Sequence, residues 1–112
     1  MRDFPAREKL DITEKVARYL VVAGTLDKNS AAEDYDVANE LSLELAMLLP
    51  ASIYRAMVEA AAHPDGKINP GVVAVMMRKE LMSITADTDL HPEQVAFHTH
   101  GAPPPKPRSK AH

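Results

Sequence analysis

The spacing of apolar residues restricts this chain to helical folds more than any other feature of its sequence. Between residues 11 and 84 the apolar side chains recur at steps of three and four, which places them on one face of a helix. No stretch of strand length alternates apolar and polar residues at every second position. We therefore predict an all-α fold, a compact bundle of four to five helices with short connections.

Two capping motifs predict where the first two helices begin. Asp11 is followed three residues later by Glu14, and Ser30 by Glu33. In such a pair the first side chain accepts a hydrogen bond from the backbone of the third residue on, and the acidic side chain reaches back. The first helix is expected to begin near Asp11 and the second near Ser30.

Prolines predict the remaining helix boundaries. Pro50 breaks the second helix and suits the first turn of a third, Asn69-Pro70 opens a fourth, and a short fifth is expected from about Pro92 to His98. The apolar faces that we expect to form the core are, helix by helix, Ile12, Val16, Tyr19, Leu20 and Ala23; Tyr35, Ala38, Leu41, Leu45 and Leu48; Ile53, Ala56, Met57, Ala60 and Ala61; and Val73, Met76, Met77, Leu81 and Ile84.

The C-terminal half of the second helix has more apolar residues than one face needs. Val37, Leu43, Met47 and Leu49 widen its stripe until that half is apolar nearly all round. Such a segment is expected either at the centre of the core or partly covered by a second subunit.

The length of 112 residues fits a single domain. We expect an N-terminal arm over residues 1–9, the helical bundle over residues 10–98 and a flexible tail over residues 99–112. Clustered prolines in the tail favour an extended chain that buries nothing, so the tail is expected to be disordered.

Charge is distributed unevenly between the bundle and the tail. Residues 1–100 carry ten basic and sixteen acidic residues, whereas the tail carries three bases, Lys106, Arg108 and Lys110. An acidic body repels phosphate backbones, although a basic tail can still contact an anionic partner.

Four carboxylates of the second helix fall on one face at steps of three and four. They are Glu33, Asp36, Glu40 and Glu44, and we call them the acidic ridge. Such ridges are often only solvated, but when they have a role they commonly face a basic partner. The acidic ridge and the three basic residues of the tail are therefore the candidate partner-binding residues.

Residue types limit the chemistry that the chain can perform. It contains no cysteine, which excludes disulfides, thiol nucleophiles and cysteine-ligated metals and suits a reducing compartment. It has no Gly-x-Ser-x-Gly elbow, no glycine-rich phosphate loop and no apolar run long enough to span a membrane. We predict a cytoplasmic protein that is not an enzyme, with no catalytic residue, cofactor, metal or membrane partner.

The string His98-Thr99-His100 resembles the His-x-His element of the JAMM/MPN metalloproteases, in which two histidines hold zinc. The resemblance covers four to six residues. Arg108 stands where the family has a serine and Ala111 where it has the third ligand, an aspartate. A looser metal group would add His91, with Asp87 and Asp89, to the two histidines, and adventitious metal binding is the favoured interpretation of it.

These patterns favour a small interaction protein, such as an adaptor, an inhibitor or an assembly subunit. We expect it to form a homo-oligomer through the surplus apolar residues of its helices and to bind a protein partner along the acidic ridge. The alternative is a DNA-associated regulator of the helix-turn-helix type. That alternative places Ala46 on the first helix of the motif and residues 53–59 on the helix that reads DNA.

Overall fold

Four α-helices follow one another in the computed structural model, which describes residues 5–81 and 90–96. A π-helical turn, η1, and a 3₁₀ turn, η2, come after them. The elements are α1 (Ala6–Gly24), α2 (Ala32–Leu48), α3 (Ala51–Ala62), α4 (Pro70–Met76), η1 (Met77–Leu81) and η2 (Pro92–Gln94). The described residues contain no strand, so the prediction of an all-α bundle is confirmed.

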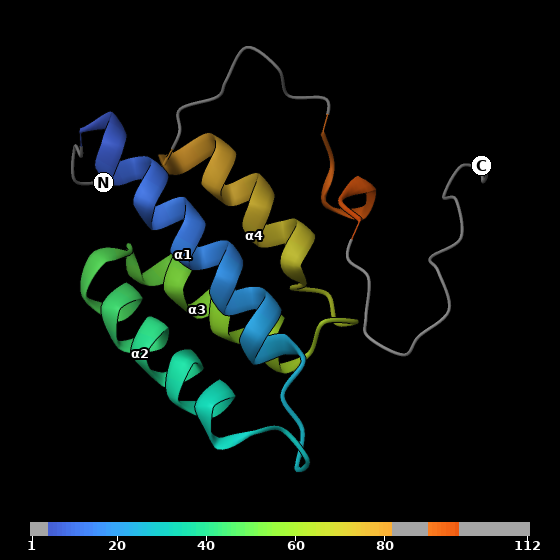
Figure 1. The fold of residues 1–112 in the computed structure, drawn as a ribbon. Coiled ribbons are helices and arrows are strands. Elements are labelled where there is room, and N and C mark those ends of the chain that lie inside the picture. Colours follow the sequence, from blue (N-terminus) through green and yellow to red (C-terminus); the bar gives the residue numbers. More distant parts are fainter. Residues whose placement is uncertain (1–4, 82–89, 97–112) are drawn as a thin grey trace.

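Helix α1 packs against both α2 and α3, α4 packs against α3, and η2 packs against α4. Figure 1 shows α1 crossing the molecule with α2 on one side of it and α4 on the other. The largest fully buried side chains come from three of the helices: Leu45 of α2, Ile53 and Met57 of α3, and Val73 of α4. Ile12 and Val16 of α1 are buried in the same cluster, so one core joins all four helices.

The predicted core faces of α1 and α3 are confirmed, since every residue named for them is buried except Ala23, which is half-buried. The face of α2 is confirmed at Ala38, Leu41 and Leu45. Tyr35, by contrast, is 40% exposed, because its hydroxyl donates a hydrogen bond to the Asp27 carbonyl oxygen at 2.6 Å in the turn that precedes α2.

The first helix begins at Ala6, so the start expected at Asp11 is wrong. Pro5 is the N-cap, and its carbonyl oxygen accepts a hydrogen bond from the Lys9 N–H at 3.0 Å. The helix thereby takes in residues 6–9 of the expected arm. Asp11 lies inside the helix, where its carboxylate pairs with Lys15 one turn later.

The capping box expected at Ser30 does not form, because α2 begins at Ala32 with Ala31 as its N-cap. The Ser30 hydroxyl oxygen accepts a hydrogen bond from the Asp27 N–H at 2.9 Å instead. It closes the turn between α1 and α2 and does not cap the helix. Pro50 likewise differs slightly from expectation, since it is the N-cap of α3 and not a first-turn residue.

Asn69 caps α4 as predicted, because its side-chain oxygen accepts a hydrogen bond from the Val72 N–H at 3.1 Å. The fourth helix is shorter than expected, since regular α-helix ends at Met76 and a π-helical turn follows. Of its predicted core face, Val73 and Met77 are buried and Met76 is half-buried. The side chains of Leu81 and Ile84 lie outside the described part.

The expected fifth helix is reduced to the three residues of η2, as far as the structure describes it. Its predicted end, residues 97 and 98, and the expected tail over residues 99–112 lie outside the described residues. Among the described helices, none combines the length and the apolar character that crossing a membrane requires.

Candidate functional site

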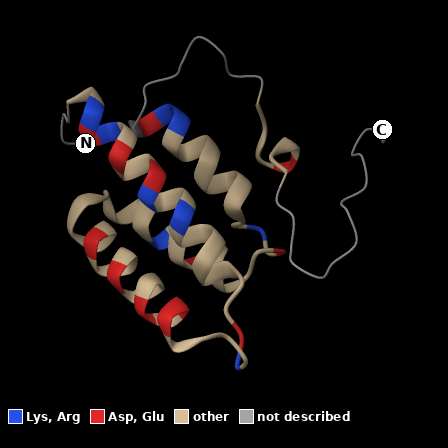
Figure 2. Cartoon of the chain, viewed as in Figure 1, with Lys and Arg blue, Asp and Glu red and all other residues tan. Residues whose placement is uncertain are grey.

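Helix α2 gathers the negative charge of the molecule. It carries five carboxylates and no lysine or arginine, and in Figure 2 it has red residues and no blue ones. Glu33, Asp36 and Glu40 are exposed, whereas Glu44 is half-buried. The helix thus brings the four carboxylates of the acidic ridge onto one face, as their spacing predicts.

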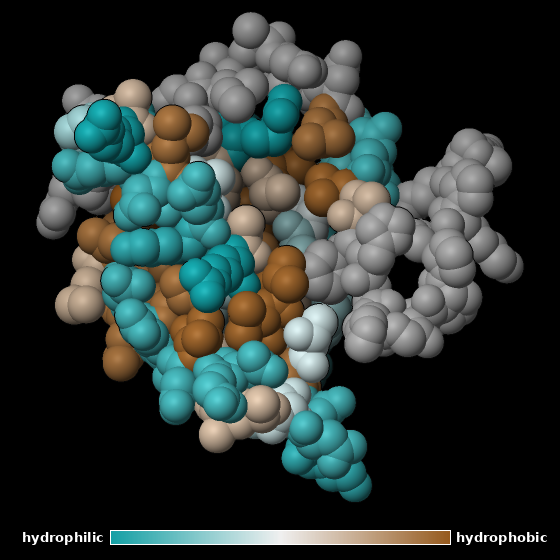
Figure 3. Space-filling view, viewed as in Figure 1, coloured by the Kyte–Doolittle hydropathy of each residue, from teal (hydrophilic) through white to brown (hydrophobic). Residues whose placement is uncertain are grey.

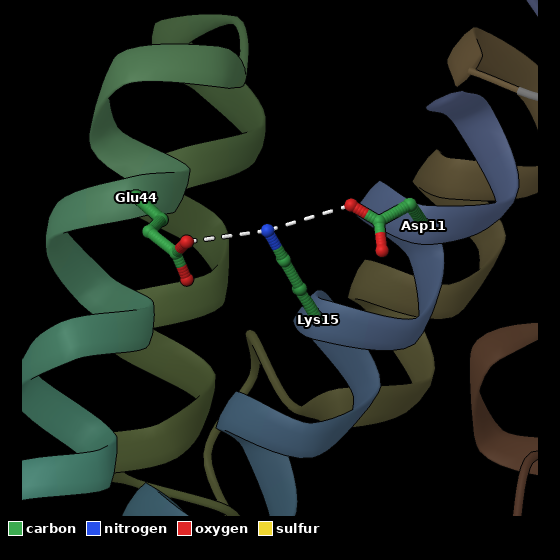
Figure 4. Close-up of polar contacts among 3 residues, drawn as sticks. All are labelled: Asp11, Lys15 and Glu44. Carbon is green, nitrogen blue, oxygen red and sulfur yellow. Dashed lines mark hydrogen bonds and ion pairs between the residues drawn. The ribbon is translucent and has the colours of Figure 1, made fainter. Parts of the chain in front are cut away.

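The C-terminal end of the acidic ridge is attached to α1. The Lys15 ammonium donates a hydrogen bond to Glu44 Oε2 at 3.2 Å and lies 3.4 Å from Asp11 Oδ2. Figure 4 shows Lys15 between the two carboxylates. The hydrogen bond to Glu44 is the main cause that raises the pKa of Lys15 above its ordinary value, although desolvation opposes it. Glu44 is therefore committed to a contact within the bundle.

A shallow depression runs between α1 and α2 beside that contact. It is lined by Asp11, Glu14, Lys15, Arg18, Val37, Glu40, Leu41 and Glu44. Two cations of α1 thus lie beside Glu40 and Glu44. Glu33 and Asp36 do not line this depression, and Glu40 lines it but is exposed and forms no ion pair among the described residues. These three carboxylates remain open for a partner.

Two large apolar side chains stand on that outward side. Leu43 is 68% exposed and Met47 is 75% exposed, whereas Leu45 between them is fully buried. A separation of four residues stacks Leu43 and Met47 one above the other on the helix. Figure 3 shows hydrophobic side chains at the surface on the side of the bundle where α2 lies.

The two exposed apolar residues adjoin two carboxylates of the acidic ridge. Glu40 precedes Leu43 by three residues, and Asp36 precedes Glu40 by four. These intervals place all four residues on neighbouring positions of one helical surface. We call Asp36, Glu40, Leu43 and Met47 the α2 face. Leu43 and Met47 were expected either at the centre of the core or under a second subunit. The structure excludes the first place, because both side chains are exposed on the side of α2 opposite Leu41 and Leu45.

The segment of the helix-turn-helix alternative contributes mainly to the core. Ile53, Ala56 and Met57 are buried, and Arg55 is the one cation of α3. The first-helix residue of that alternative, Ala46, is exposed. The exposed side of α3 thus offers few groups of the kind that read base edges.

The other predicted groups lie partly or wholly outside the described residues. His91 is exposed at the start of η2, where its backbone N–H donates to Gln94 Oε1 at 2.8 Å. Within the described ranges no group of three or more histidine or acidic side chains is arranged to hold a metal ion. The residues that lie outside them are Asp87, Asp89, His98, His100, Lys106, Arg108 and Lys110.

Comparison with known proteins returns no match of this chain to a protein-family model, to a curated protein or to a solved structure.

Proposed function

We propose that this chain is a small, non-enzymatic protein–protein interaction module of the cytoplasm that self-associates through the α2 face. One observation carries the proposal. Leu43 and Met47 remain 68% and 75% exposed side by side, in a helix whose opposite side forms the core. Single exposed apolar residues are ordinary, but adjacent large ones rimmed by polar residues are typical of interaction sites.

The α2 face combines the two elements that a docking surface needs. Burial of Leu43 and Met47 against a partner supplies the apolar anchor, on which most of the binding free energy of an interface commonly depends. Asp36 and Glu40 beside them steer the approach of a basic surface and fix its orientation. In the described residues neither carboxylate forms an ion pair within the chain.

A location in the cytoplasm accords with the residue content. The sequence contains no cysteine, so no part of it depends on an oxidising compartment.

Light scattering coupled to size exclusion tests the proposal, over chain concentrations from about 10 µM to about 1 mM, the range in which weak association is detected. The wild-type mass is expected to rise with concentration above the 12.3 kDa of one chain. The variant Leu43→Asp/Met47→Asp is expected to stay at 12.3 kDa. Both positions are exposed, so the substitutions remove no core contact, and circular dichroism checks that the variant is folded.

The matched control is Leu10→Asp/Val21→Asp, which places the same charges on two α1 residues that are 55% and 56% exposed. It should associate like the wild type. A wild-type chain that remains at 12.3 kDa over the whole range would refute self-association. A Leu43→Asp/Met47→Asp variant that associates like the wild type would show that the α2 face is not the contact.

A further inference from the structure

An open groove lies between α3 and α4. Its apolar floor is formed by Ala56 of α3 and by Val72 and Met76 of α4. Ile68, in the turn that joins the two helices, is 40% exposed at one end of the groove. The groove therefore offers apolar surface on a scale that fits one or two large side chains.

The rim of this groove is basic. Arg55 of α3 and Lys67 of the α3–α4 turn both line it and both are exposed. Glu59, one turn after Arg55, adds one carboxylate to the same rim. In the part of the chain that the structure describes, neither cation forms an ion pair.

The groove and the α2 face are complementary in two respects. The face presents two apolar side chains beside two carboxylates, and the groove presents an apolar floor beside two cations and one carboxylate, Glu59. Opposite charges that flank matching apolar surfaces are the arrangement by which interfaces select a partner and its orientation.

The two surfaces cannot meet within one molecule. α2 packs on α1 whereas α4 packs on α3, and Figure 1 shows α2 and α4 on opposite sides of α1. Contact between the α2 face and the groove therefore requires two molecules.

We infer that the α2 face of one copy of this chain docks into the α3–α4 groove of a second copy. The inference rests on the proposed function and specifies which surface meets the α2 face. Leu43 and Met47 enter the groove over Ala56, Val72 and Met76. Asp36 and Glu40 approach Arg55 and Lys67.

Such a contact is head-to-tail, because the two copies contribute different surfaces. A pair then keeps one unused groove, on the first copy, and one unused α2 face, on the second, so further copies add at both ends. The assembly is expected to grow with concentration past two copies. A symmetric contact between two α2 faces would stop at a dimer.

Mixing two blocked variants of the full chain tests the inference. Leu43→Asp/Met47→Asp blocks the α2 face and leaves the groove intact. Arg55→Glu/Lys67→Glu reverses the rim of the groove and leaves the α2 face intact. The matched control for the second variant is Arg7→Glu/Lys28→Glu, which reverses two exposed cations away from the groove lining. Circular dichroism and a urea midpoint check that each variant is folded.

Each blocked variant alone is expected to scatter as one chain of 12.3 kDa, and an equimolar mixture is expected to show twice that mass and no more. The reason is that only one productive contact, between the face of one variant and the groove of the other, remains in the mixture. The Arg7→Glu/Lys28→Glu control should assemble like the wild type.

The outcomes that overturn the inference differ from those that overturn the proposed function. If Leu43→Asp/Met47→Asp is a single chain but the mixture does not pair, or if Arg55→Glu/Lys67→Glu assembles like the wild type, the groove is not the receiving surface. The role of the α2 face would then stand. If the wild type itself never associates, both fail.

A third variant separates the groove from the basic tail as the occupant of the α2 face. Lys106→Glu/Arg108→Glu/Lys110→Glu reverses the three tail charges in the full chain. Assembly is expected to be unchanged. Loss of assembly in this variant alone would assign the α2 face to the tail and overturn the inference.

Discussion

Lys15 of α1 donates a hydrogen bond to Glu44 of α2 at 3.2 Å, across 29 positions of the sequence. The contact joins the two helices beside their shared core and withdraws one carboxylate of the acidic ridge from any partner. Glu44 therefore holds α2 to α1, whereas the other carboxylates of α2 are open to solvent. Asp36 and Glu40 of the α2 face are among these open carboxylates.

The Lys15–Glu44 pair predicts a small, salt-sensitive contribution to stability. Both side chains are partly exposed, at 28% and 36%, so water and salt screen their attraction. Lys15→Met is expected to lower the urea midpoint slightly in dilute buffer, and by less at about 1 M salt, where the screening length falls to about 3 Å. Lys28→Met, at an exposed lysine outside the pair, is the control and should show no such salt dependence. If Lys15→Met lowers the urea midpoint as much in high salt as in low salt, the lysine acts through packing.

Leucine-to-alanine substitutions on the two sides of α2 are expected to change stability by very different amounts. Leu45 is fully buried, and Leu45→Ala is expected to lower the free energy of unfolding by about 2–5 kcal/mol. Leu43→Ala, two positions earlier at 68% exposure, is expected to change it by less than about 0.5 kcal/mol. Urea unfolding of the two variants at low chain concentration measures both values. Equal losses would show that α2 is rotated relative to the core.

The close approach of Gly71 to Pro92 holds η2 against α4, so a larger residue at position 71 is expected to disturb this contact. A Cβ at this position would overlap the carbonyl oxygen of Pro92 and would lie 3.1 Å from Asn69 Oδ1. Gly71→Ala is therefore expected to displace η2 from α4. The Val95 N–H donates a hydrogen bond to the Pro92 carbonyl oxygen, and its hydrogen exchange should become faster. The comparison is Gly66→Ala, whose Cβ would meet the His63 carbonyl oxygen at 3.1 Å and needs only a small adjustment. Unchanged exchange at Val95 in Gly71→Ala would show that η2 does not depend on this close approach.

Burial of Tyr19 predicts a loss of stability at alkaline pH. Desolvation, together with the charge of Tyr54, raises the pKa of Tyr19 above its ordinary value of 10.0. The folded state then holds the phenolic proton more tightly than the unfolded state does. The contribution of protonated Tyr19 to the free energy of unfolding is therefore complete below about pH 10. It is lost as the pH rises toward the higher pKa of Tyr19 in the folded state.

The measurement is urea unfolding at about pH 8 and about pH 10.5 for the wild type and Tyr19→Phe. The wild type is expected to lose more stability over this interval. Some loss should persist in Tyr19→Phe, because the pKa of Lys15 is also raised and acts in the same direction. An equal loss in both proteins would show that Tyr19 is not the group responsible.

The core of this fold could be predicted where one helical face contrasts with the others. α1 and α3 each have a single apolar stripe, and the residues named for those stripes are buried or half-buried. Helix starts were harder, because residues that can cap a helix can also close a turn. Ser30 bonds to Asp27 in the turn before α2, and Pro5 begins α1 ahead of the motif at Asp11.

The site was harder to predict than the core. The acidic ridge follows from spacing within one helix, and the structure places it on one face. The loss of Glu44 to Lys15 depends on how α1 packs against α2, which no local pattern encodes. For Leu43 and Met47 the sequence left open whether they lie in the core or at a subunit contact, because their half of α2 is apolar on nearly every side. Only packing shows which of those residues stay at the surface.

The most direct test of self-association through the α2 face is the methyl NMR spectrum of the wild-type chain, recorded at increasing concentration with labelled methionines. Met47 is 75% exposed on the α2 face, Met76 lines the groove, and Met57 is fully buried in the core. Docking of the α2 face into the groove predicts that the Met47 and Met76 resonances shift together as the mass rises, while the Met57 resonance stays in place. A Met47 resonance that does not move while the chain associates would contradict it.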